Sequence, residues 1–109
     1  MIKHIVCFKL KENSESAKKE AKDILMSMDG KIPEIKAIEV GMDFLCSEKS
    51  YDIILQVVFE NRESLDIYQN DKYHCEVVKS YVRANASSSI VIDYEIWYKK
   101  QGKNNKEKW

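Results

Sequence analysis

The sequence contains no apolar stretch long enough to cross a bilayer. Its apolar runs, such as Ile53 to Phe59, fall far short of the roughly 20 residues that a spanning helix needs. It also has no excess of charge of either sign, because eighteen Lys and Arg balance eighteen Asp and Glu. A chain without net charge has no overall field to attract phosphate backbones or anionic lipid. We therefore expect neither nucleic acid nor a membrane as a partner.

Cysteine is sparse and unpatterned. Cys7, Cys46 and Cys75 are widely spaced, odd in number and free of any C-x-x-C arrangement. This pattern argues against a disulfide framework, a zinc site or a dithiol redox pair, and it predicts reduced thiols. Met1 leads directly into a strand-like segment without an apolar signal region, so we expect a cytoplasmic protein.

The sequence also lacks the common motifs for phosphate binding and for a nucleophilic serine. The sequence has no Gly-rich phosphate loop and no G-x-S-x-G elbow. A metal site would require His4, His74 and a carboxylate to converge, and no i, i+4 ligand pair favours this. We therefore expect neither a cofactor nor a metal.

The chain is nevertheless apolar enough to fold. Its 109 residues are 44% hydrophobic, which is sufficient for one domain with one modest core. We assign residues 1–98 to this domain. Residues 99–109 are polar and rich in lysine, apart from Trp109, and we expect them to form a flexible tail.

Four segments have the pattern of strands. Apolar residues alternate along Ile2–Leu10 and Tyr51–Phe59, and Ile90–Tyr98 is rich in β-branched and aromatic residues. Ile35–Met42 also resembles a strand, but its parity changes near Ala37. This change indicates either a bulge or a different strand boundary.

The segment after the first strand has apolar residues at helical spacing. We predict a helix that begins after Asn13 or Ser14 and ends near Asp29, followed by Gly30 and Pro33 as stop signals. Its apolar stripe consists of Ala17, Ala21, Ile24, Leu25 and Met28, and we place Lys18, Lys19 and Lys22 on its solvent side.

A second helical region has two pieces. Asn61 can cap a short helix that contains Leu65 and Tyr68, and Asp71 can cap another. The apolar stripe of the second piece consists of Cys75, Val78 and Val82. We therefore predict a break in this region near Asn70.

The resulting order, β-α-β-β-α-β, is typical of the ferredoxin-like fold of the α+β class. Both helices would cover one face of a four-stranded antiparallel sheet. The other face would be too apolar to remain exposed to solvent, so we expect a second copy of the chain to cover it in a homodimer. We assign to that outer face Ile5, Cys7, Ile54, Gln56, Val58, Val91, Glu95 and Trp97.

Segments along nearly the whole domain resemble one known family. They are MIKHIVCFKLK from Met1, GKIPEI from Gly30, VG from Val40, YDIIL from Tyr51, YQNDKYH from Tyr68 and VIDY from Val91. Together they resemble the stress-responsive dimeric α/β-barrel (Dabb) family. The family often has His-Pro where this chain has Asp71-Lys72.

The resemblance implies a ferredoxin-like protomer, a homodimeric α/β barrel and a cavity between sheet and helices. It implies no single activity, because members include plant stress and defence proteins and a polyketide cyclase. In that cyclase, catalysis is attributed to a tyrosine and a histidine that match Tyr68 and His74, and a first-strand histidine matches His4.

The candidate residues also have chemistry of their own. His74 lies near the start of the helix capped by Asp71, where the helix dipole favours neutral imidazole and thus a general base. Tyr68 could donate a hydrogen bond to a carbonyl or enolate oxygen if the break brings both side chains together. The alternative is that His74 packs a helix start, that Tyr68 is a satisfied buried aromatic and that His4 only lines the cavity.

Asp93 receives low weight as an orienting carboxylate, because its parity opposes the apolar residues Ile92 and Tyr94. Three functions remain open. The first is a homodimer that binds a small apolar or aromatic molecule. The second is a cofactor-independent cyclase, lyase or isomerase with His74 as base and Tyr68 as oxyanion donor. The third is a structural, stress-protective protein without catalysis.

Overall fold

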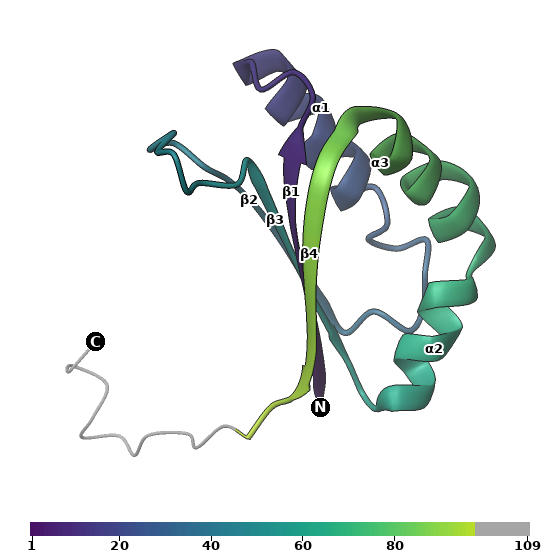
Figure 1. Ribbon diagram of the computed structural model, residues 1–109. Helices are drawn as coiled ribbons and strands as arrows, with labels where there is room; N and C mark the ends of the chain where they lie inside the picture. Colours follow the sequence, from purple (N-terminus) through teal and green to yellow (C-terminus); the bar gives the residue numbers. More distant parts are fainter. Residues whose placement is uncertain (98–109) are drawn as a thin grey trace.

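The computed structural model describes residues 1–97 and confirms a ferredoxin-like arrangement in which the helices cover one face of a sheet (Figure 1). The sheet has four strands in the order β2-β3-β1-β4, and all neighbours are antiparallel. The elements in chain order are β1 (Ile2–Leu10), α1 (Glu15–Met26), β2 (Ala37–Met42), β3 (Ile53–Phe59), α2 (Arg62–Asn70), η1 (His74–Lys79), α3 (Ser80–Asn85) and β4 (Ala86–Glu95). The predicted tail, residues 99–109, lies outside the described residues.

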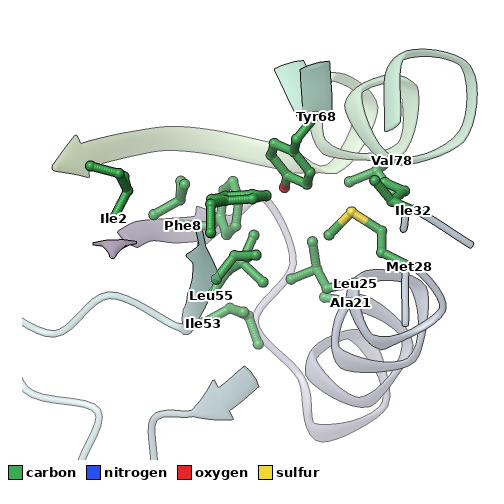
Figure 2. Packing of buried hydrophobic residues seen from close by; sticks show 13 residues of the cluster. Ile2, Phe8, Ala21, Leu25, Met28, Ile32, Ile53, Leu55, Tyr68 and Val78 are labelled. Carbon is green, nitrogen blue, oxygen red and sulfur yellow. The ribbon is translucent and has the colours of Figure 1, made fainter. Parts of the chain in front are cut away.

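The core fills the space between the sheet and the helices. Alternate residues of β1 and β3 point into it, as the sequence alternation predicts. Opposite them, α1 contributes Ala21 and Leu25, and Tyr68 reaches in from α2 (Figure 2). The buried residues of the two central strands are Ile2, Val6, Phe8, Ile53, Leu55, Val57 and Phe59.

Helix α1 begins where a side chain caps it. The Ser14 hydroxyl accepts a hydrogen bond from the Ala17 backbone at 3.2 Å. The prediction that Lys18 lies on the solvent side is wrong, because Lys18 is only 1% exposed. Its Nζ donates to the Asp43 carbonyl at 3.1 Å and lies 3.7 Å from Cys46 Sγ, so α1 is fastened to the loop after β2. A long aliphatic stem can pack like an apolar side chain, and the helical pattern alone does not reveal this.

Strand β2 begins at Ala37, later than the predicted Ile35, whose backbone nitrogen instead donates to the Ile32 carbonyl in a turn. The pairing of β2 with β3 runs without a register shift. The parity change near Ala37 therefore marks the strand boundary and not a bulge.

Strand β4 corrects the predicted outer face. It starts at Ala86, earlier than the predicted Ile90, and Val91 pairs opposite Val6. Because directly paired residues share a face, Val91, Asp93 and Glu95 lie on the helix side. The outer face receives Ile90, Ile92 and Tyr94 instead, while Trp97 follows the strand.

The outer face of the sheet is apolar, and no element in the described part of the chain covers it. Ile90, Ile92 and Tyr94 are 49%, 59% and 39% exposed. Cys7 and Ile54 continue this surface across the central strands, and the helices lie on the opposite side (Figure 1). Among residues 1–97, no helix combines the length and the apolar character needed to cross a membrane.

Candidate functional site

The break between the two helical pieces is a sharp turn at Asp71. Helix α2 starts at the Asn61 cap, whose side chain accepts from the Ser64 backbone at 2.8 Å, and it ends where Asp71 adopts an extended conformation. The Asp71 carboxylate then accepts from the His74 backbone at 3.0 Å and starts the next helical segment. That segment, η1, is a π-helix, a rare geometry that occurs often at functional sites.

The turn brings Tyr68 and His74 together. Six residues apart on a straight helix, their side chains would point about 240° away from each other. In the structure their ring centroids are 4.2 Å apart. The Tyr68 ring enters from the helical layer and its hydroxyl points toward the sheet (Figure 2). The expectation that the break would bring both side chains together agrees with this arrangement.

Two polar atoms of this pair have no partner. Tyr68 is 0% exposed and His74 is 7% exposed. Neither Tyr68 Oη nor His74 Nδ1 forms a hydrogen bond within the described residues. A buried unsatisfied group costs roughly 1–3 kcal/mol, and most buried polar groups in proteins are satisfied. Two such atoms on neighbouring rings therefore mark a place where a ligand could form hydrogen bonds with the protein.

The surroundings keep both groups uncharged. Burial is the largest cause that lowers the pKa of His74, to about 4, and the charge of Lys79 lowers it further. A hydrogen bond with the Gln69 backbone and the charge of Asp71 act in the opposite direction without outweighing burial. Burial, followed by the charge of Asp93, raises the pKa of Tyr68 above its usual value. At neutral pH the pair is a neutral imidazole beside a protonated phenol.

His4 adds a second histidine to the same place. It is 5% exposed, and its ring lies edge-on to the Tyr68 ring at a centroid distance of 5.6 Å. His4 Nδ1 bonds to the Asp93 carboxylate from the neighbouring strand, because the two residues pair directly in the sheet. The low weight given to Asp93 rested on the wrong face of β4. The structure places Asp93 on the helix side, where it orients a histidine.

A pocket of about 300 Å³ joins these residues. Tyr68, His74 and His4 line it together with apolar side chains of the core. Its remaining lining residues are Val6, Phe8, Leu25, Leu55, Gln69, Val78, Lys79, Val82, Arg83 and Val91. The sequence analysis missed the two cations in this set, although their spacing of four residues on a helical segment is a readable signal.

A metal has no evident place in the described part of the chain. In residues 1–97 no group of three or more His, Cys, Asp or Glu side chains lies close enough together to hold an ion. The pocket therefore offers a hydrogen-bond donor, a neutral imidazole and an oriented histidine among apolar walls, and Lys79 and Arg83 add two cations to its lining.

The model of the stress-responsive A/B barrel (Dabb) domain matches residues 2–96. The chain belongs to the Dabb family. No curated protein is significantly similar to it in sequence. Membership in Dabb agrees with the ferredoxin-like order of the strands and with the helices on one face.

Solved structures of similar fold differ in function. A dimeric protein of unknown function from Bacteroides fragilis is 26% identical, with a TM-score of 0.71 over 87% of this chain and 95% of that chain. A Dabb protein from Mesorhizobium loti is 18% identical, with a TM-score of 0.76 over 89% and 97%. The hydroxynitrile lyase of Passiflora edulis is 16% identical, with a TM-score of 0.75 over 92% and 96%. The fold is shared by proteins without a known reaction and by an enzyme.

Proposed function

We propose that this Dabb protein is a homodimer that binds a small apolar or aromatic molecule, whose polar end meets Tyr68 and His74. The observation that carries the proposal is the pair of buried, unpartnered polar atoms in one apolar pocket. A ligand that supplies their missing hydrogen bonds removes a cost of roughly 1–3 kcal/mol at each atom. Ligand pockets commonly combine apolar walls with a few convergent polar groups.

The hydrogen-bond roles at the inner end restrict the ligand. The ring of His74 forms a hydrogen bond with the Gln69 backbone, while Nδ1 has no partner. Because a carbonyl only accepts, the nitrogen that faces Gln69 carries the proton and Nδ1 offers a lone pair. The Tyr68 hydroxyl can donate. A ligand hydroxyl matches both, since it accepts from Tyr68 and donates to His74.

The homodimer rests on the outer face of the sheet. Ile90, Ile92 and Tyr94 expose a continuous apolar surface that no element within residues 1–97 covers. Patches of this kind on a small soluble domain mark an interface. The similar Bacteroides fragilis protein is described as dimeric, which supports the same assembly here.

A second candidate function is cofactor-independent acid–base catalysis. The specific observation in its favour is the neutral His74, whose free nitrogen is adjacent to the Tyr68 phenol. His74 would remove a proton from a bound hydroxyl or carbon acid, and Tyr68 would stabilise the developing oxyanion. The fold of the Passiflora edulis hydroxynitrile lyase supports this candidate only at the level of architecture.

The binding proposal is tested with 2-naphthol, an aromatic molecule with one hydroxyl, by isothermal titration calorimetry. The unmodified protein should bind it, and Tyr68→Phe should weaken binding about fivefold, the value of one hydrogen bond. Tyr73→Phe is the matched control, because its hydroxyl bonds to Ser27 away from the pocket. Absence of binding, or equal affinity in Tyr68→Phe, would contradict the proposal and favour a purely structural role.

The assembly is tested by sedimentation equilibrium. Ile92→Lys places a charge on the outer face and should shift the protein from dimer to monomer. Ile67→Lys is the control, because Ile67 is 45% exposed but lies on helix α2, on the other side of the sheet. A monomeric unmodified protein, or equal effects of both substitutions, would refute the proposed interface.

The catalytic candidate is tested with mandelonitrile, a cyanohydrin, by following benzaldehyde release. Lyase activity of this kind should disappear in His74→Ala while 2-naphthol binding is weakened only modestly. Release no faster than in His74→Ala would refute the lyase form of this candidate and leave the binding proposal standing.

A further inference from the structure

The lining of the pocket carries two positive charges. Lys79 and Arg83 both line it, and no Asp or Glu does. The whole chain has a formal net charge of zero, so this local imbalance does not reflect the general composition. The pocket therefore carries a local excess of positive charge, which acidic residues elsewhere in the chain offset.

These two cations are placed side by side by the helical segment. Lys79 ends η1 and Arg83 lies four residues later in α3, a spacing that puts both on one face. That face is continuous with the inward stripe of Val78 and Val82, which also line the pocket. Lys79 is half-buried and Arg83 is exposed, so both charges border the apolar walls where the pocket meets solvent.

Neither cation is neutralised within the described residues. The ion pairs in residues 1–97 include neither Lys79 nor Arg83. Lys79 Nζ donates to the Gln69 carbonyl at 3.3 Å, and this contact supplies no countercharge. The other arginine of the chain, Arg62, is instead paired with Glu95 at 2.9 Å.

Two carboxylates adjoin the pocket without lining it. Asp93 bonds to His4, and Asp71 accepts from the His74 backbone. Both carboxylates are therefore engaged in hydrogen bonds with the two histidines of the site, His4 and His74. They leave the guanidinium of Arg83 free to bind an anion, and this group is charged at every physiological pH.

We propose that the ligand is an amphipathic hydroxy acid: an apolar or aromatic body with a hydroxyl at Tyr68 and His74 and an anionic carboxylate at Lys79 and Arg83. This inference rests on the proposed binding function and narrows its ligand class. A guanidinium binds a carboxylate through parallel charge-assisted hydrogen bonds, which give both affinity and orientation.

The test compares 6-hydroxy-2-naphthoate with 2-naphthol by calorimetry, because the two probes share the ring system and the hydroxyl and differ in the carboxylate. We expect the carboxylate probe to bind about tenfold more tightly at low salt, and this advantage should shrink as salt is added. Arg83→Gln should remove most of this advantage, so that it lowers the affinity for the carboxylate probe by a much larger factor than the affinity for 2-naphthol.

Arg62→Gln is the matched control, since it removes the other arginine outside the pocket. It should change neither affinity. Equal affinity for the two probes, or equal losses in Arg83→Gln and Arg62→Gln, would overturn the hydroxy-acid inference while 2-naphthol binding preserves the proposed function. Failure of both probes to bind would refute the proposed function together with the inference.

Discussion

Removal of the Tyr68 hydroxyl is expected to stabilise the ligand-free protein. Tyr68 is fully buried and its Oη has no hydrogen-bond partner within the described residues. In the unfolded chain the same hydroxyl is hydrated, whereas in the folded chain no described residue forms a hydrogen bond with it. Tyr68→Phe removes this hydroxyl and keeps the aromatic ring in the core.

The size of the effect follows from two opposing contributions. Desolvation of an unpaired buried hydroxyl costs roughly 1–3 kcal/mol. Loss of the oxygen leaves a small void, and the lost packing offsets part of the gain, by under about 1 kcal/mol. We therefore expect Tyr68→Phe to raise the free energy of unfolding by about 1 kcal/mol. For a domain of this size, that corresponds to an increase in Tm of about 4–8 °C.

The assay is urea denaturation of refolded protein at fixed chain concentration, because bound ligand and dimerisation both raise apparent stability. Tyr73→Phe is the control, since the Tyr73 hydroxyl lies 2.6 Å from Ser27 Oγ. This substitution should lower the free energy of unfolding by about 1 kcal/mol. If Tyr68→Phe is destabilising to the same extent as Tyr73→Phe, the Tyr68 hydroxyl is satisfied and the reasoning about the pocket fails.

Three further substitutions test other parts of the structure. Lys18→Ala should lower the free energy of unfolding by about 1–3 kcal/mol in urea titrations, because it removes a buried stem and its hydrogen bond, whereas Lys19→Ala on the exposed side should change it by under about 0.5 kcal/mol. The pKa of His74 is lowered to about 4 from 6.5, so the unfolded chain binds the extra proton first. The free energy of unfolding is therefore unaffected by this group above pH 6.5, and it falls by up to about 3 kcal/mol as the pH decreases from 6.5 to 4. His74→Gln should flatten this part of the pH profile of stability. Asn61→Ala removes the cap of the helix that carries Tyr68 and should cost about 1 kcal/mol by thermal unfolding, with a loss near zero contradicting the capping role.

Much of the fold could be predicted because its central strands alternate cleanly. In β1 and β3 the inward residues are apolar apart from His4, and the ends are marked by turns and caps, so the pattern has one interpretation. The break between α2 and η1 was readable for a similar reason. Asn61 and Asp71 both have the chemistry of a cap, and both act as caps in the structure.

Strand β4 shows why the rest could not be predicted. Its more apolar parity, with Ile92 and Tyr94, was taken as the side facing the helices, which is the usual rule for a lone domain. The structure puts that parity on the outer face and leaves Asp93 on the helix side. The error has a physical source, because a face that a second chain covers carries the same apolar pattern as a core.

Lys18 and Asp93 both escaped prediction because their roles depend on a partner far away in sequence. Lys18 meets a loop 25 residues later, and Asp93 meets a histidine 89 residues earlier. Local periodicity contains no information about such contacts. The proximity of Tyr68 and His74, in contrast, depends on one nearby turn and could be anticipated.

The π-helical geometry of η1 gives this segment an unusual response to deletion. A π turn contains one residue more than an α turn, so the loss of one residue between His74 and Val78 would convert it to ordinary helix without breaking it. The loss of the π turn would absorb the deletion, so the segments on either side would keep nearly their present orientation. Homologues one residue shorter here would therefore keep their architecture but lose the π turn beside the pocket, so chain length in this segment would separate relatives that have the π turn from those that do not.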